Sequence, residues 1–328
     1  MRTKIVYVLV SQETDYYYEM LLLSLYSLRL HHPKGDAEVE VVMDEDTHQR
    51  LVEKKAEILN DVTPIVVPIP PEYTVMQRSR YLKTQLRQIV KGDFLFLDCD
   101  TLVCDALHDI DNFNGEVAMV HNCNNSSNVR LVDQLPRIKQ AGFNTPEDAP
   151  YYNSGVIFAR DTPAVSQLFV DWHRLWKLSL KKDVPYDQPA LQRADCDNGY
   201  SIIELPNAWN YQLRIAINPF TQNTKVLHYI YSYKNNQTMS RVLSYIKQVG
   251  KIDNRIAPLA SCPKSIGFTV CTIPDKRVIG FLISDLIYIY DTVPTLYKTI
   301  SWMAKLLVAP IQYFYHIKQN LKKWMKIN

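Results

Sequence analysis

The fold of this chain is decided by the stretch Phe94-Leu95-Phe96-Leu97-Asp98-Cys99-Asp100. Its four consecutive apolar residues predict a strand that is buried on both faces of a sheet. Two carboxylates follow directly. Residues two apart on an extended chain point the same way, so we expect Asp98 and Asp100 to converge on one cation. Two solvated acids at a strand end, or a helix cap, would give the same pattern.

The segments around this strand alternate between strand-like and helix-like patterns. Strands are predicted at residues 4–10, 39–43, 62–67, 117–120, 155–159 and 201–205. Helices are predicted at residues 15–30, 44–59, 78–90, 163–180 and 188–194. Such repeated units predict an α/β fold with a parallel, doubly wound sheet. Ligands of such sheets bind beyond the carboxyl ends of the strands, which here means the residues after Val10 and Leu97.

Further polar residues flank the predicted strands and helices and could join the two carboxylates: Arg80 with Lys83, Asn153, Asp187 with Gln188, and His228. The basic pair shares one helix face and could lean over a diphosphate. The histidine ends a short apolar segment and could supply a nitrogen ligand. Carboxylates suit Mg²⁺ or Mn²⁺, which would bridge and neutralise phosphate oxygens. Taken singly, Asn153 is also explained as a turn residue and Asp187 as a helix cap, and His228 alone is better explained as a core or surface histidine.

Together and in this order, the motifs resemble those of the GT-A-type nucleotide-sugar glycosyltransferases, most closely glycosyltransferase family 8 with its retaining galactosyl- and glucosyltransferases. The resemblance extends over roughly residues 4–231. It implies a GT-A fold, which is Rossmann-like with a mostly parallel sheet flanked by helices. It also implies Mn²⁺ or Mg²⁺ as cofactor and UDP-glucose or UDP-galactose as donor. The implied reaction is retaining hexose transfer to a glycan or lipid-linked saccharide, in bacterial surface-polysaccharide synthesis.

The resemblance implies a role for each motif. Asp98, Asp100 and His228 would bind the metal, and Asp98 would also touch the donor ribose. Catalytic contacts to the donor sugar would come from Asn153, Asp187 and Gln188, with Gln188 nearest the anomeric carbon. The remaining donor contacts would come from the first strand, its loop and the basic helix, namely Val8, Val10, Ser11, Arg80 and Lys83. The loop from Ser11 to Tyr17 is longer than the acidic-Asn-Tyr loop that is usual in the family.

Composition excludes several other classes of protein. The chain has 328 residues, of which 47% are hydrophobic and 22% charged, a balance typical of globular proteins. Its net charge of +3 gives no field for nucleic acid, which we exclude as a partner. The six cysteines lack zinc-site spacing and indicate a reducing compartment, so we expect a cytoplasmic protein. No leader and no apolar run of the ~20 residues that cross a bilayer are expected.

A change of composition near residue 235 predicts two parts, a catalytic domain at 1–235 and an extension at 236–328. Residues 292–328 hold six lysines and no acid, which leaves 31 basic against 34 acidic residues in the remainder. Two amphipathic basic and aromatic helices are predicted within 297–326, divided at Pro310. Such helices suit an anionic membrane surface, so we expect peripheral binding to the inner face of the cell membrane. Packing of their apolar face against the body would explain the same pattern.

Two other functions share part of this pattern. A phosphatase of the haloacid-dehalogenase kind has a similar Asp-x-Asp signature, partly mimicked by Asp98-Cys99-Asp100-Thr101. That signature normally ends the first strand of its domain, whereas three predicted strands precede it here. A catalytically inactive GT-A-like binding subunit would keep the fold without turnover. The intact polar set argues against this second alternative.

Overall fold

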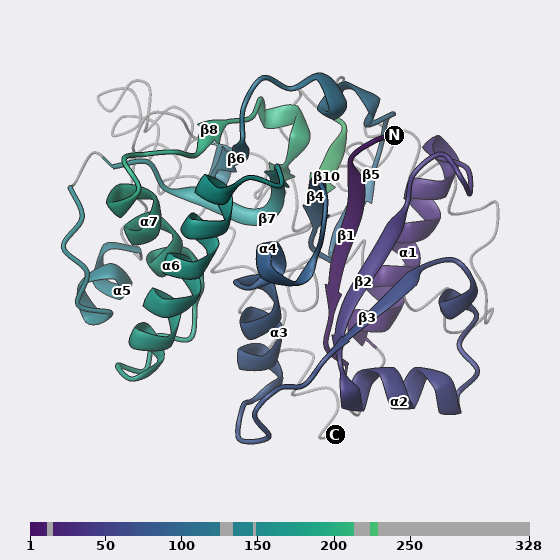
Figure 1. The fold of residues 1–328 in the computed structure, drawn as a ribbon, viewed down its shortest axis with the longest axis horizontal. Coiled ribbons are helices and arrows are strands. Elements are labelled where there is room, and N and C mark those ends of the chain that lie inside the picture. The colour runs from purple at the N-terminus through teal and green to yellow at the C-terminus, as the bar shows by residue number, and fades with distance from the viewer. Residues whose placement is uncertain (12–15, 125–133, 147–148, 213–223, 229–328) are drawn as a thin grey trace, which may run out of the picture. The chain divides into compact units, whose positions relative to one another are not determined.

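The computed structural model describes residues 1–11, 16–124, 134–146, 149–212 and 224–228, and all of them fall in one compact unit. The unit is built on a seven-stranded sheet of order β3-β2-β1-β4-β7-β6-β8 (Figure 1). Its strands are β1 (Lys4–Leu9), β2 (Val39–Asp44), β3 (Thr63–Val67), β4 (Phe94–Leu97), β6 (Val117–His121), β7 (Tyr152–Ala159) and β8 (Ile203–Glu204). The predicted α/β fold with a mostly parallel sheet is confirmed.

Helices flank this sheet. Their bounds are α1 (Tyr16–His31), α2 (Glu45–Glu53), α3 (Val75–Lys83), α4 (Leu86–Ile89), α5 (Gln134–Gln140), α6 (Pro163–Leu180) and α7 (Gln188–Asp197). Helices α1 and α2 lie beside the β1–β3 end of the sheet, and α5, α6 and α7 gather at the other end (Figure 1). Trp172 and Trp176 on α6 are four residues apart on one face of the helix and are fully buried, so they belong to the core.

Strand β7 departs from the parallel arrangement and thereby places the site. It pairs antiparallel with both β4 and β6, whereas β1, β2, β3 and β4 pair in parallel. Because β7 runs against β4, the first residues of β7 lie beside the last residues of β4. The pairing Leu97↔Val156 and a 2.8 Å hydrogen bond from Asp98 N–H to the Gly155 carbonyl fix this register. The start of β7 therefore meets the carboxylates that follow β4.

A second, three-stranded sheet completes this region in the order β5-β10-β9. It consists of β5 (Thr101–Val103), β9 (Tyr211–Gln212) and β10 (Val226–His228). In its register His228 lies opposite Thr101 on one side and Gln212 on the other. The pairing brings a residue more than a hundred positions downstream next to Asp100.

Several element bounds differ from the sequence-based predictions. The helix predicted at 44–59 ends at Glu53, and Lys55 turns the chain with a φ of 48°. The helix predicted at 78–90 begins earlier, at Val75, because Thr74 and Gln77 form a capping box. It is also interrupted, since α3 ends at Lys83 and a separate turn, α4, follows. The strand predicted at 201–205 is reduced to Ile203–Glu204.

Among the described residues, no helix combines the length and the apolar character that a membrane span requires. The predicted boundary near residue 235 and the predicted helices within 297–326 lie outside the described residues.

Candidate active site

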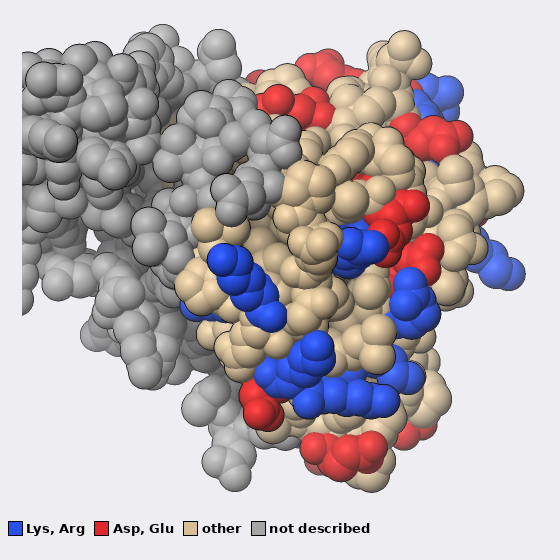
Figure 2. Space-filling model, turned by 90° about the vertical axis from the view of Figure 1, so that its left-hand side faces the viewer, with Lys and Arg blue, Asp and Glu red and all other residues tan. Residues whose placement is uncertain are grey.

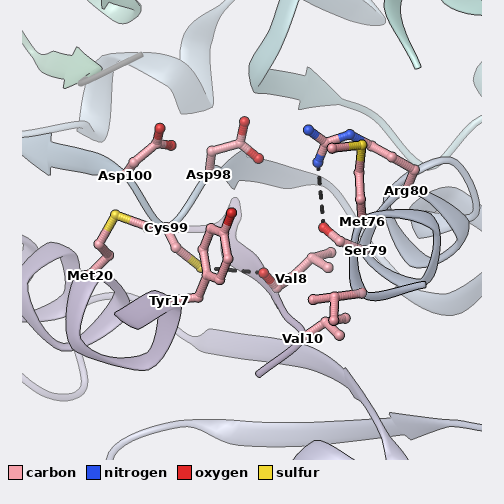
Figure 3. Close-up of a pocket in the computed structure, with 11 residues that line it drawn as sticks. Val8, Val10, Tyr17, Met20, Met76, Ser79, Arg80, Asp98, Cys99 and Asp100 are labelled. Atoms are coloured by element: carbon pink, nitrogen blue, oxygen red, sulfur yellow. Dashed lines mark hydrogen bonds between the residues drawn. The ribbon is translucent and has the colours of Figure 1, made fainter. Parts of the chain in front are cut away.

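The two carboxylates of the Asp-x-Asp stretch meet through a turn and not on extended chain. Asp98 directly follows β4, and Asp100 lies in the turn that leads into β5. The turn is closed by Thr101, whose hydroxyl donates to the Asp98 carbonyl at 2.8 Å. Asp98 and Asp100 thus point to the same side of the turn, as Figure 3 shows. The predicted convergence is present, although its cause is the turn and not strand alternation.

His228 completes a group of three ligating side chains. Ligand atoms of Asp98, Asp100 and His228 all lie within 4.8 Å of one another. The histidine Nε2 is 3.1 Å from Asp100 Oδ1 and 4.0 Å from Asp98 Oδ2. Burial opposes ionisation of Asp100, but the neighbouring His228 outweighs it and lowers the pKa of the carboxyl. Two carboxylates and one imidazole nitrogen are a donor set that suits a divalent cation such as Mn²⁺.

The basic pair of α3 lies directly against these acids. Lys83 is 1% exposed, and its Nζ is 3.1 Å from both carboxylate oxygens of Asp98. Arg80 Nε lies 3.0 Å from Asp187 Oδ1, and Lys83 Nζ lies 3.8 Å from Asp187 Oδ2. One helix face therefore neutralises two carboxylates that come from different parts of the chain.

Asp187 precedes α7 but does not cap it. Its side chain makes no hydrogen bond to the first turn, so the alternative explanation as a helix cap is wrong. Instead Asp187 Oδ2 accepts a 2.6 Å hydrogen bond from the Ser154 hydroxyl. Burial disfavours the charged form, but Lys83 and Arg80 lower the pKa of Asp187 below its ordinary value. Asp187 is thus a buried, ionised carboxylate held by two cations and a hydroxyl.

A pocket of about 330 Å³ opens beside these residues. Its lining is Val8, Val10, Tyr17, Met20, Val75, Met76, Ser79, Arg80, Asp98, Cys99 and Asp100 (Figure 3). Two predicted donor-contact residues, Ser11 and Lys83, are not part of this lining. The Ser11 N–H donates to the Thr47 hydroxyl at 2.9 Å, and the Lys83 side chain is almost fully buried. Tyr17, Met20, Met76 and Ser79 could not be predicted as lining residues, because their spacing fits an ordinary helix face.

The predicted sugar-binding amides lie beside the start of β7. Gln188 Nε2 donates to the Tyr152 carbonyl at 3.0 Å and to Asn122 Oδ1 at 3.3 Å. Asn153 Nδ2 donates to the same oxygen of Asn122, also at 3.3 Å. Two residues of this network, Asn122 and Asn210, were not predicted from the sequence. Asn210 is fully buried and donates to Asn153 Oδ1 at 2.9 Å. Polar residues just after a buried strand were the only available signal for Asn122.

A second pocket, of about 550 Å³, lies among α5, α6 and α7. Lys and Arg side chains gather on this face (Figure 2), and Arg174, Lys181, Lys182 and Arg193 line the pocket. Arg174 is paired with Asp171 at 3.0 Å and Arg193 with Asp197 at 2.6 Å. These paired and solvated charges make a less convincing site than the pocket at Asp98 and Asp100.

Comparison with known proteins identifies the fold. No protein-family model matches the sequence, and no curated protein matches it. Solved structures do match: an active-site glutamine-to-glutamate mutant of LgtC superposes with a TM-score of 0.50, at 13% identity, over 78% of this chain and 99% of that one. The chain has the GT-A fold. The resemblance inferred from the motifs is therefore confirmed at the level of the fold.

Two further GT-A structures are similar to the chain. The galactosyltransferase LgtC, crystallised with donor and acceptor sugar analogues, matches with a TM-score of 0.49 and 12% identity over 78% of this chain and 99% of that chain. Mouse xyloside xylosyltransferase 1 matches with a TM-score of 0.46 and 14% identity, over 69% of this chain and 97% of that chain.

Proposed function

We propose that this chain is a metal-dependent glycosyltransferase. It would move a hexose from a UDP-sugar to a glycan or lipid-linked saccharide in surface-polysaccharide synthesis, with retention at the anomeric carbon. One observation carries the proposal: in a GT-A fold, the ligating group Asp98, Asp100 and His228 adjoins a pocket that begins at Val8 and Val10 on the first strand. A nucleotide in this pocket would have its base near the first strand and its diphosphate near the carboxylates.

The leaving diphosphate sets the main catalytic need. Breaking a glycosyl–phosphate bond builds negative charge on the departing oxygen, and Mn²⁺ or Mg²⁺ held by Asp98, Asp100 and His228 would neutralise that charge. Arg80 lines the same pocket and brings a permanent positive charge to it. Lys83 is too deeply buried to reach far into the pocket, so its role is to neutralise Asp98 and Asp187.

Positive charge develops on the donor sugar in the transition state, so the residues around the sugar must stabilise it. The amide nitrogen of Gln188 is engaged by the Tyr152 carbonyl and Asn122, whereas its Oε1 has no hydrogen bond to a described residue. A carbonyl oxygen presented in this way would stabilise an oxocarbenium-like transition state. Asp187 has both oxygens engaged by Arg80, Lys83 and Ser154, which suits a fixed negative charge and not an attacking nucleophile.

The two alternatives are not favoured. A haloacid-dehalogenase-like phosphatase would carry its acids on a different fold. An inactive binding subunit has no need of a buried ionised Asp187 or of three converging metal-ligating side chains. Both alternatives predict that donor turnover is absent.

The decisive experiment is donor hydrolysis by the purified full chain, measured as UDP release across a panel of UDP-sugars. We expect slow release from one hexose donor with Mn²⁺ and none with EDTA. The matched control is Lys139→Ala, on the exposed part of α5, which should hydrolyse the donor as the wild type does. Silence across the panel, without UDP-induced thermal stabilisation, would contradict the proposal.

We further propose that the chain works at the inner face of the cell membrane through its predicted C-terminal helices. Six lysines without an acid in residues 292–328 support this, because anionic lipid attracts such segments. Deletion of residues 292–328 should abolish sedimentation with anionic vesicles. Unchanged sedimentation would refute the membrane role and leave the transferase proposal intact.

A further inference from the structure

We infer that Asn210 is a positioning residue that turns the Nε2 lone pair of His228 toward Asp98 and Asp100. The inference rests on the proposed cation site, because it concerns how one ligand of that site is oriented. It follows from a chain of hydrogen-bonded side-chain amides whose polarity is fixed by backbone groups at two places, Asn153 and Gln188.

The first backbone anchor is the N–H of Gly155. A backbone N–H can only donate, so the Asn153 atom that lies 2.9 Å from it must be the oxygen Oδ1. The Asn210 atom that lies 2.9 Å from this oxygen must then be the donor Nδ2. Asn210 therefore presents its oxygen to the other side, where His228 Nδ1 lies at 2.9 Å. An oxygen can only accept, so His228 carries a proton on Nδ1.

The second anchor gives the same polarity independently. The Tyr152 carbonyl can only accept, so the Gln188 atom at 3.0 Å from it must be the nitrogen Nε2. This nitrogen and Asn153 Nδ2 both donate to Asn122 Oδ1. No amide in the chain has to be reversed to satisfy a neighbour. The hydrogen bonds therefore run from His228 through Asn210 and Asn153 to Asn122 Oδ1, which also accepts from Gln188.

A proton on Nδ1 leaves Nε2 of the neutral imidazole as an acceptor. That nitrogen lies 3.1 Å from Asp100 Oδ1 and 4.0 Å from Asp98 Oδ2, so it can accept either an added proton, which it then shares with Asp100, or a cation in the same place. This is the arrangement in which a histidine ligates a metal with one nitrogen while the other donates to an oxygen. Asn210 is fully buried and His228 is 4% exposed, so water does not compete for the Nδ1 hydrogen bond.

The absence of a side chain at Gly155 makes room for the imidazole ring of His228. A Cβ at this position would overlap His228 Cε1 and would lie 2.7 Å from Nδ1 and 2.9 Å from Asn153 Oδ1. The glycine thus both anchors the amide chain through its N–H and leaves room for the imidazole. Ring position and ring polarity depend on the same two residues, Gly155 and Asn210.

The experiment measures Mn²⁺ affinity of the full chain by electron paramagnetic resonance of free Mn²⁺, without any donor. Asn210→Ala should bind Mn²⁺ about 10–100-fold more weakly, the usual cost of losing such an outer partner. Asn210→Asp keeps the acceptor for Nδ1 but loses the donor to Asn153 Oδ1, so it should bind Mn²⁺ more tightly than Asn210→Ala and less tightly than the wild type. The matched control Asn207→Ala changes an exposed asparagine of the same segment and should leave Mn²⁺ affinity unchanged.

A second measurement reads the proton directly. Long-range ¹H–¹⁵N spectra of histidine-labelled wild type with Mg²⁺ should show the His228 proton on Nδ1. A proton on Nε2 alone would overturn the inference, even where Asn210→Ala fails to fold. Equal Mn²⁺ affinity of wild type and Asn210→Ala would overturn it too, while the cation site stands. Absence of Mn²⁺ binding by the wild type would instead refute the cation site of the proposed function, and the inference with it.

Discussion

The described part of the chain holds two clusters of carboxylates and histidines that look alike in composition. One is Asp98, Asp100 and His228, and the other is His32, Asp36 and His108. In the second cluster, the Leu107 N–H donates to His32 Nε2 at 2.8 Å, so the neutral ring carries its proton on Nδ1. That nitrogen faces Asp36 Oδ2 at 2.7 Å and donates to it. The imidazole of His32 therefore turns an N–H toward its carboxylate, whereas the neutral imidazole of His228 turns a lone pair toward Asp98 and Asp100.

The difference lies in the group behind each imidazole. His228 has an amide oxygen behind it, which draws the proton away from the carboxylates. His32 has a backbone N–H behind it, which drives the proton toward the carboxylate. Residue types within reach of a cation are thus insufficient to identify a metal site. The partner of the far ring nitrogen decides whether the near nitrogen can ligate.

The largest expected effect is on Mn²⁺ binding and donor turnover, when one carboxylate is removed from each cluster in turn. Asp100→Ala should abolish measurable Mn²⁺ binding and reduce donor turnover by a factor on the order of 10² to 10³. Asp36→Ala should bind Mn²⁺ and turn over the donor as the wild type does, at some cost in stability. Calorimetric titration of Mn²⁺ and UDP release measure both. Full activity of Asp100→Ala with Mn²⁺ would contradict the assignment of Asp98, Asp100 and His228 as the cation site. Loss of Mn²⁺ binding in Asp36→Ala would show that the two clusters are not distinguished as proposed.

Much of this arrangement could be predicted from sequence because it depends on local pattern. The apolar run before Asp98 marks a strand buried on both faces, and polar residues after buried strands of one sheet gather at one edge. The shared helix face of Arg80 and Lys83 could be predicted for the same reason, because the two residues are one helical turn apart.

The remainder depends on pairing between distant segments. Nothing near residue 155 encodes that β7 runs antiparallel to β4, or that the ring of His228 rests on Gly155. Asn210 has no motif of its own, and its meaning arises only from the hydrogen bonds to Asn153 and His228. Likewise, the sequence around His32 predicts a helix end but not the Leu107 N–H that fixes the ring.

Alanine substitution of one glycine beside each cluster, Gly155 or Gly35, tests the same difference in Mn²⁺ binding. Gly155→Ala should push the His228 ring from its seat, and we expect Mn²⁺ affinity to fall by about 10–100-fold. Gly35→Ala, next to Asp36, meets no atom within 4 Å and is strained only by its φ of +95°. It should cost about 1–2 kcal/mol of stability with Mn²⁺ affinity unchanged. Urea unfolding and Mn²⁺ titration of both variants test this. Wild-type Mn²⁺ affinity in a folded Gly155→Ala protein would contradict the proposed seat.

The smallest expected effect concerns the pH dependence of stability at the second cluster. Burial lowers the pKa of His32, although the hydrogen bond to Asp36 opposes the change, and His108 and His31 add like charge nearby. A histidine with a lowered pKa in the folded state contributes stability above its ordinary pKa, and this stability is lost as the pH falls below about 6.5. His32 and His108 in turn lower the pKa of Asp36 to about 2, so its contribution is lost only as the pH falls below about 4.

His32→Gln removes the titrating ring from this cluster while keeping one donor and one acceptor. We expect the variant to be less stable than the wild type at pH 7 by about 1 kcal/mol, the usual worth of a hydrogen bond. The gap should narrow as the pH falls from 7 to 5, because only the wild type loses the His32 contribution. Urea unfolding at each pH, with and without Mn²⁺, provides the measurement. A gap of constant size would refute the titration of His32. A gap that widens with Mn²⁺ would show that the second cluster binds the cation, and the backbone N–H behind a histidine would then no longer distinguish the two sites.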